Sequence, residues 1–437
     1  MRATSLLLAA ALSTVPCLAR AAGDVPMPSM SSAGGTTILQ QLDDRASLVG
    51  VELEIRAGLN RQTLKQNGLA ALTAETILRS PVGTPPMPLE EAVAANGGSI
   101  RFTVDPDNVH FYVESLAVDA PAVLNLVRQT LAAPDFGPAT VRDARSSLVR
   151  QIAQSQQWAL GVGIEMLAAA SSPQANTGLP ALGTPASLYQ LFPKDAESFY
   201  RTFYRRGGSY VSAAGRLSAL DPNALAQLSQ SLPEGNTEAI PVRVAPLRGA
   251  SHEIVTHRDV SSPWLIAQYP APSVESRDFG PMLVLAAFVR RTLSDIAQVP
   301  GVVTTTFASR AVGTLYTYDH RPARLVLYVN GGIGNPSRAF ATALSVVNVL
   351  AATRLQGSIS DFKAEAAGDF AIGATTLETR AWLAAVFARE SSSPDFLNRT
   401  LNAIAATTPE DLQRVARLYL GNPTIALVLP RDGSPSN

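Results

Sequence analysis

The sequence predicts an α+β protein with two similar duplicated halves, each a mainly antiparallel sheet packed with helices. Its 437 residues exceed the length that one hydrophobic core usually takes. Three segments recur: VELEIRAG ending at Gly58 matches WLIAQYPAP ending at Pro272, HFYVESL around Tyr112 matches RLVLYVNG around Tyr328, and two final segments begin at Phe199 and Val415. Each pair lies about 215 residues apart, and this nearly constant spacing indicates an internal repeat.

The N-terminus is typical of a secretory signal peptide in residues 1–22. Arg2 is followed by an apolar run over residues 6–12 and a small-residue cleavage site at 19–21. We therefore expect a periplasmic protein. Cys17, the only cysteine, lies inside the signal, so the mature chain should have no thiol for a disulfide, a nucleophile or a metal. Pro16 argues against lipidation at Cys17 but leaves it open.

Further boundaries follow from composition. We expect a flexible linker over residues 23–40, an N-terminal domain over 41–231, an interdomain linker over 232–250, a C-terminal domain over 251–432 and a tail over 433–437. Lys and Arg number 35, as do Asp and Glu, which disfavours nucleic-acid binding driven by net charge. Because no run of about 18 apolar residues occurs, we expect no membrane span.

Local patterns predict the individual elements. Apolar and charged residues alternate over 51–55, which indicates a strand. Helical spacing of apolar residues predicts one helix that begins after Gly68 and ends before Ser80-Pro81, and others over 121–131 and 138–154. Thr408 to Asp411 form a capping box that starts the last helix, with Pro409 at its first position. The sequence SHEIVTH, residues 251–257, alternates and indicates a strand.

The helix predicted between Gly68 and Ser80-Pro81 carries Ala71, Ala74 and Glu75 on one face. These positions follow the i, i+3, i+4 spacing at which an inverted zinc motif, H-x-x-E-H, places its first ligand, its general base and its second ligand. Two of the three side chains here are methyl groups. An ordinary core helix would have the same composition. The helix alone is therefore weak evidence for a degenerate zinc motif, and the evidence comes from the segments around it.

Those segments resemble the insulinase and pitrilysin-type (inverzincin) metallopeptidases, a family that includes the mitochondrial processing peptidase. In this sequence a strand ends in Ala57-Gly58, the helix after Gly68 follows, GT stands at Gly83-Thr84, and a further helix leads through a double glycine into a strand. The family has the same order of segments, and its first helix carries the motif G-x-A-H-x-x-E-H-x-L. The resemblance implies the duplicated α+β fold of that family. It also implies a zinc ion held by two histidines and by a glutamate about 76 residues beyond them.

The resemblance places Ala71 and Glu75 at the histidine positions, Ala74 at the base and Gln151 at the distant glutamate. A zinc site needs three protein ligands and an open position for water, and this set does not supply them. We therefore expect no metal, no cofactor and no catalysis at these residues. The family's second-half arginine and tyrosine, in L-R-x-x-x-G-x-x-Y, correspond to Ala297 and Thr304.

The other candidate residues have spacings that do not suit a catalytic site. His252 and His257 are five residues apart, which does not suit a helical zinc motif, and His110 and His320 stand alone in the sequence. Arg310 and Tyr316 lie near the missing Arg and Tyr but have the wrong spacing. No nucleophile elbow, phosphate-binding loop or dinucleotide fingerprint is present.

These observations lead to the expectation of a non-catalytic insulinase-type protein. It would bind unfolded peptides as the partner subunit of a zinc-bearing family peptidase, as a heterodimer, with a self-dimer as the other possibility. A stand-alone peptide-binding or scaffold protein of the cell envelope is an alternative. A weak peptidase with an unrecognised site is another.

Overall fold

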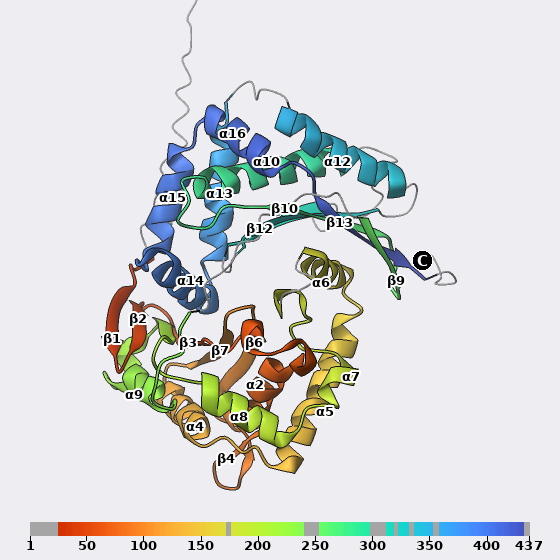
Figure 1. The fold of residues 1–437 in the computed structure, drawn as a ribbon. Coiled ribbons are helices and arrows are strands. Elements are labelled where there is room, and N and C mark those ends of the chain that lie inside the picture. Colours follow the sequence, from red (N-terminus) through yellow and green to blue (C-terminus); the bar gives the residue numbers. More distant parts are fainter. Residues whose placement is uncertain are drawn as a thin grey trace, which may run out of the picture.

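The computed structural model describes residues 25–171, 176–239, 253–297, 312–318, 322–331, 336–352 and 358–431. The expectations for residues 1–22, Cys17, His252, Thr304, Arg310 and His320 fall outside these ranges. Within them the protein is an α+β structure with two mixed sheets and helices packed on both (Figure 1).

The first sheet has six strands in the order β1-β2-β8-β3-β7-β6, and the second has five in the order β11-β12-β10-β13-β9. The strands of the first sheet are β1 (Ser29–Ala33), β2 (Thr36–Leu42), β3 (Leu48–Ile55), β6 (Gly98–Val104), β7 (Val109–Leu116) and β8 (Tyr210–Gly215). Those of the second are β9 (Glu253–Arg258), β10 (Trp264–Pro270), β11 (Val312–Thr317), β12 (Arg324–Asn330) and β13 (Thr424–Pro430). The short strands β4 (Pro81–Val82) and β5 (Met87–Pro88) pair separately.

The two sheets share one strand order once β1 is set aside. β2-β8-β3-β7-β6 corresponds to β9-β13-β10-β12-β11, and in each sheet the first of these pairs is parallel while the rest are antiparallel. The three segment pairs identified from their spacing contain β3 and β10, β7 and β12, and β8 and β13. Each pair therefore occupies the same place in its sheet.

The helices include the four that local signals in the sequence predict. Those from the first part of the chain are α2 (Leu69–Arg79), α3 (Leu89–Ala95), α4 (Ala120–Ala132), α5 (Pro138–Ser155), α6 (Ala159–Ser171), α7 (Pro185–Leu188), α8 (Pro193–Phe203) and α9 (Ala224–Gln230). Those from the second are α10 (Phe279–Ala297), α12 (Pro336–Ala352), α13 (Ser360–Gly373), α14 (Leu377–Ser391), α15 (Phe396–Ala406) and α16 (Pro409–Tyr419). α2 ends before Ser80-Pro81, and Thr408 caps α16 by accepting a hydrogen bond from the Asp411 backbone N–H. The predicted capping box is thus confirmed.

One face of the first sheet packs against α2, α4 and α8. Alternate residues of β3, including Val51, Leu53 and Ile55, are buried there with Leu72 and Ile77 of α2. Burying such a side chain stabilises the fold by about 1.5–3 kcal/mol. The opposite face of β3 carries Glu52 and Glu54, because side chains alternate along a strand.

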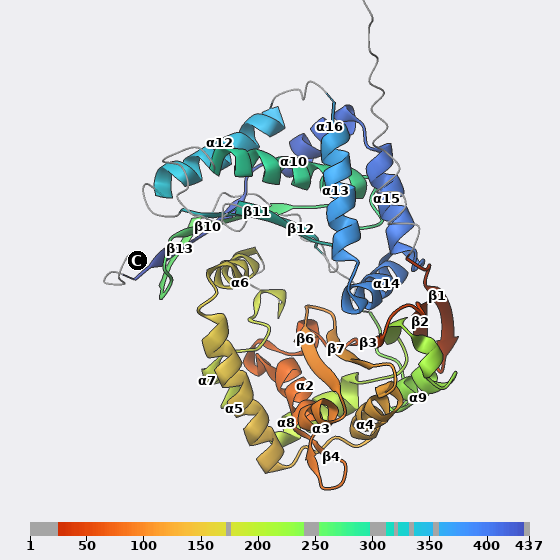
Figure 2. The same ribbon diagram turned by 180° about the vertical axis from the view of Figure 1, so that it is seen from behind.

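Each sheet takes a helix from the other part of the chain, as the two opposite views show (Figure 1, Figure 2). α14 lies against β3 and β8 of the first sheet, and its Phe387 shares a buried cluster with Leu39 of β2. α6 lies against β10 and β13 of the second sheet, where Val162 packs with Ile266 and Val428. This exchange makes the chain a single unit, so the expectation of two separate halves is too simple.

The N-terminal segment also differs from the expectation. β1 and β2 form a hairpin over residues 29–42, and β2 pairs in parallel with β8. Most of the segment predicted as a flexible linker, residues 23–40, therefore belongs to the first sheet, since the buried side chains of Ile38 and Leu39 tie it down. The 23–40 assignment is corrected accordingly.

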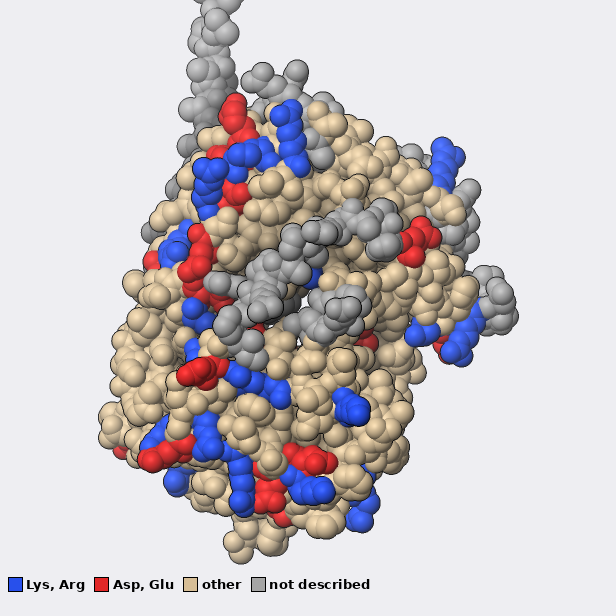
Figure 3. Space-filling view, viewed as in Figure 1, with Lys and Arg blue, Asp and Glu red and all other residues tan. Residues whose placement is uncertain are grey.

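In the part of the chain that the structure describes, no helix is both long and apolar enough to cross a bilayer. On the face drawn in Figure 3, basic and acidic side chains lie intermixed rather than in patches of one sign.

Candidate functional site

The zinc-motif positions lie on α2, in the hydrophobic core beside the first sheet. Ala71 and Ala74 are completely buried in the hydrophobic core, and Glu75 is 1% exposed. α2 packs against α5, which carries Gln151. The structure therefore brings together the residues that the sequence analysis singled out, although they are far apart in the chain.

Glu75 is held by two neighbours. Its Oε1 accepts a hydrogen bond from Arg79 Nε at 2.8 Å, and its Oε2 accepts one from Gln151 Nε2 at 3.2 Å. Arg79 Nη2 lies 2.9 Å from Glu90 Oε2 and donates to Ser147 Oγ at 3.1 Å. Burial lowers the pKa of Arg79, but the hydrogen bond to Glu75 and the nearby carboxylates outweigh it, and the pKa is raised. The guanidinium of Arg79 thus already pairs with the carboxylates of Glu75 and Glu90.

These residues do not fit zinc. They supply one carboxylate, already paired, and a neutral amide, where a catalytic zinc requires three protein ligands. Ala74 can neither accept nor deliver a proton. Across the described residues, no group of three or more His, Cys, Asp or Glu side chains is arranged to hold a metal ion. The arrangement can anchor α2 to α5, but it cannot turn water into a nucleophile.

A cavity of about 400 Å³ opens beside this network. It is lined from α2 by Glu75 and Arg79, from α5 by Arg150 and Gln151, and from β6 by Phe102, among others. The lining is strongly polar and borders the edge strand of the sheet.

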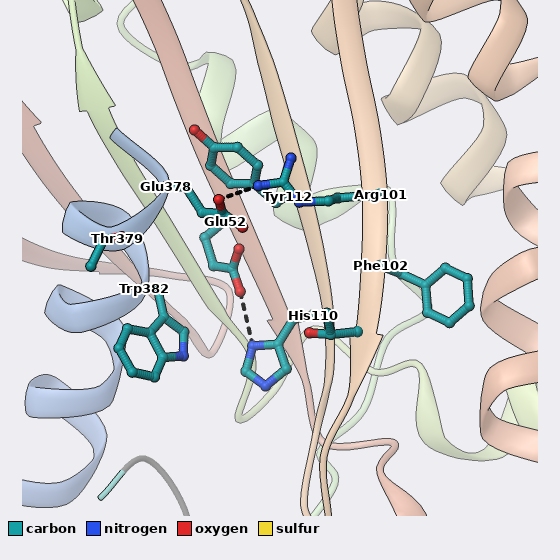
Figure 4. A pocket seen from close by; sticks show the side chains of 9 residues that line it. Glu52, Arg101, Phe102, His110, Tyr112, Glu378, Thr379 and Trp382 are labelled. Carbon is teal, nitrogen blue, oxygen red and sulfur yellow. Dashed lines mark hydrogen bonds and ion pairs between the residues drawn. The ribbon is translucent and has the colours of Figure 1, made fainter. Parts of the chain in front are cut away.

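A second polar centre lies on the other face of the first sheet. His110 of β7 is 7% exposed, and its Nδ1 lies 2.8 Å from Glu52 Oε1 of β3 (Figure 4). Its Nε2 lies 2.8 Å from Asp105 Oδ2. Burial lowers the pKa of His110, but the hydrogen bonds to Asp105 and Glu52 outweigh it and raise that pKa well above its ordinary value. His110 therefore lies hydrogen-bonded between two carboxylates that favour its protonated form, although it stands alone in the sequence.

The same centre joins the sheet to α14. Glu54, next to Glu52 on this face of β3, forms an ion pair with Arg389 of α14, and Arg389 also pairs with Glu390. Glu54 is 1% exposed. Burial raises the pKa of Glu52, and the hydrogen bond with His110 opposes that rise.

A pocket of about 250 Å³ lies between this face and α14. Figure 4 shows Arg101 and Phe102 of β6, His110 and Tyr112 of β7, Glu52 of β3, and Glu378, Thr379 and Trp382 of α14 around it. The sequence offered one signal for this pocket, which is the charged residues at alternate positions of an otherwise apolar strand.

The remaining candidates that lie in the described residues do not assemble into a site. Ala297 is the last residue of α10. Tyr316 donates its hydroxyl to the Pro272 carbonyl and packs against Phe279, so it is engaged inside the fold. His257 is exposed in β9, which is a strand as predicted.

Comparisons with known proteins agree with this architecture. Residues 37–184 match the family model described as Insulinase (Peptidase family M16). No curated protein matches the chain.

Solved structures match far more of it. A protease from Helicobacter pylori is 13% identical, with 93% of this chain and 100% of that chain covered and a TM-score of 0.77. A peptidase M16 inactive domain from Pseudomonas fluorescens is 14% identical, with 93% and 99% covered and a TM-score of 0.75. A chain of complex III2 from Candida albicans is 13% identical, with 92% and 95% covered and a TM-score of 0.72. Residues 37–184 are therefore similar to the insulinase family, peptidase family M16, and the chain has the same fold as these solved structures.

Proposed function

We propose that this protein is a non-catalytic insulinase-family protein that binds unfolded peptides as the partner subunit of a zinc-bearing family peptidase. The observation that carries the proposal is the closed network of Glu75, Arg79 and Gln151 at the positions where the family motif would hold zinc. The likeness in fold to an M16 domain named inactive supports it.

Peptide binding is supported by the edge of the first sheet. Among the described strands, β6 pairs only with β7, so its other edge offers backbone N–H and C=O groups. An extended peptide can add to such an edge as a further strand. Arg101 and Phe102 of β6 line both cavities, so alternate side chains of an added strand would face one cavity and then the other.

The peptide step can be tested with a fluorescent, unstructured peptide and a copy of it N-methylated at alternate backbone amides. Strand addition requires backbone hydrogen bonds, so the methylated copy should bind at least about tenfold more weakly, because several bonds of about 1 kcal/mol each are lost. Equal anisotropy titrations for both peptides would contradict binding at the β6 edge.

The partner step can be tested by co-expression with a zinc-bearing M16 peptidase from the same organism. We expect a complex of one copy of each chain by light scattering and a changed rate of peptide cleavage. If the two chains neither associate nor alter cleavage, the partner role fails. A monomer or self-dimer that still binds peptide would instead favour the stand-alone envelope protein.

The alternative function, a weak peptidase with an unrecognised site, can be tested separately. Purified chain that hydrolyses peptides, and loses that activity with a chelator, would overturn the non-catalytic assignment. The periplasmic location is likewise a proposal, and sequencing the N-terminus of protein recovered from the periplasm would test cleavage near residue 22.

A further inference from the structure

We propose that the pocket between β6, β7 and α14 is a specificity pocket that takes a basic side chain, a guanidinium or an ammonium group, of the bound peptide. The inference rests on the peptide binding proposed above and adds the class of side chain that is selected. It stands on four features of the pocket, which are a half-paired carboxylate, an excess of negative charge, aromatic walls and its position beside β6.

The half-paired carboxylate is Glu52. It is 3% exposed and lines the pocket. Its Oε1 accepts a hydrogen bond from His110 Nδ1, whereas no side chain among the described residues donates to its Oε2. Because Glu52 lines the pocket, its Oε2 is open to a donor from a ligand. A cationic ligand group would supply the missing donor and a compensating charge.

The charge of the surrounding cluster points to the same ligand. Its cations are Arg101, His110 and Arg389, and its carboxylates are Glu52, Glu54, Asp105, Glu114 and Glu378. Negative groups outnumber positive ones even with His110 fully protonated. A ligand cation is therefore favoured over an anion, and the low-dielectric surroundings strengthen that preference.

The walls of the pocket suit a flat or compact cation. Trp382 and Tyr112 contribute aromatic rings, and cations bind favourably over such faces. The protein already places one guanidinium there, since Arg101 Cζ lies 4.6 Å from the Tyr112 ring centroid while Arg101 pairs with Glu378. The volume of about 250 Å³ is below the usual range for drug-sized ligands, so it fits one side chain rather than a larger molecule.

The pocket also lies where a peptide on β6 would reach it. Arg101 pairs in register with Tyr112, and Thr103 with His110, so these side chains share the face of the sheet that carries Glu52. Every second residue of a strand added beside β6 projects from this same face. Such a peptide side chain therefore lies on the face of the sheet where the pocket opens, whereas its neighbours point to the opposite cavity.

The test uses two fluorescent peptides that differ at one central position, arginine in one and citrulline, its neutral isostere, in the other. We expect the full chain to bind the arginine peptide about tenfold more tightly or better, the range that a charge-assisted hydrogen bond supplies. Glu52→Gln removes the charge but keeps an acceptor for His110. It should abolish the discrimination between the arginine and citrulline peptides.

Two further variants keep the test decisive. Trp382→Leu removes an aromatic wall without touching the ion pairs and should weaken arginine binding several-fold. Glu197→Gln, on the exposed side of α8, is the matched control and should bind as the unmodified protein does. If Glu52→Gln does not fold by circular dichroism, Trp382→Leu decides the question.

The outcomes separate the two proposals. Equal binding of both peptides to the unmodified protein, or full discrimination retained in Glu52→Gln and Trp382→Leu, would overturn the specificity pocket and leave the peptide-binding function standing. If neither peptide binds at all, the proposed function fails and the pocket inference fails with it.

Discussion

The ion pair between Glu54 of β3 and Arg389 of α14 should be a main link between the two parts of the chain. The Arg389 side chain is 13% exposed and that of Glu54 is 1% exposed, so solvent screens the pair little. Replacing Arg389 by methionine keeps most of the packing but leaves the Glu54 carboxylate buried without its cation. Breaking a buried pair in this way typically costs about 3–5 kcal/mol. That corresponds to a factor of about 10² to 10⁴ in the unfolding equilibrium.

The assay is urea unfolding followed by circular dichroism, combined with amide hydrogen exchange to locate the effect. Exchange should accelerate in α14 and in the strands β3 and β8 beneath it, because α14 loses its anchor to that face. The double variant Glu54→Gln/Arg389→Met removes both charges and should cost less than Arg389→Met alone. Arg201→Met removes an exposed ion pair on α8 and should change stability by less than about 1 kcal/mol. A loss below about 1 kcal/mol for Arg389→Met, or a double variant worse than the single one, would refute the reasoning.

Further predictions concern the same fold and the two polar centres. Phe387→Ala empties a fully buried position between α14 and its neighbours and should lower the free energy of unfolding by about 3–5 kcal/mol, and a loss near zero in the same urea assay would contradict that packing. Gly163→Leu should cost about 1–3 kcal/mol, because a Cβ at this position of α6 would lie only 2.5 Å from Ile266 Cδ1, whereas an unchanged thermal midpoint would exclude the close contact. His110 has a raised pKa in the folded state. Its contribution to stability is therefore complete below the ordinary histidine pKa of about 6.5 and is lost as pH rises through the raised value. His110→Gln should remove this loss of stability at higher pH. Adding zinc or a chelator should leave the thermal midpoint unchanged, and a reproducible zinc-dependent rise would show that the Glu75 region does bind metal.

Much of the secondary structure could be predicted because its signals are local. Apolar periodicity located α4 and α5 within a residue or two, and Thr408 with Asp411 marked the start of α16. The spacing between segments also anticipated which strands share a place in the two sheets. These signals depend on neighbours within one or two turns, or on a repeat that can be counted along the chain.

The two polar centres show where such reasoning stops. Glu75 and Gln151 could be connected only through the family resemblance, and Arg79, which completes their network, carried no signal of its own. His110 seemed isolated because its partner Glu52 is 58 residues away in the chain. The strand pairing of β3 with β7 brings them opposite each other, and no local pattern encodes that pairing.

By itself, the sequence determined the helices and strands that have local signals, the repeat of three segments, and the presence of methyl groups and an amide where the family motif has zinc ligands and a base. The tertiary structure decided the exchange of α6 and α14 between the sheets, the guanidinium that closes the Glu75 site, and the pairing of His110 with Glu52 and Asp105. The physical reason is the range of the interactions. Periodicity and capping act between near neighbours, whereas buried charges are paired only when the folded topology brings distant side chains into contact.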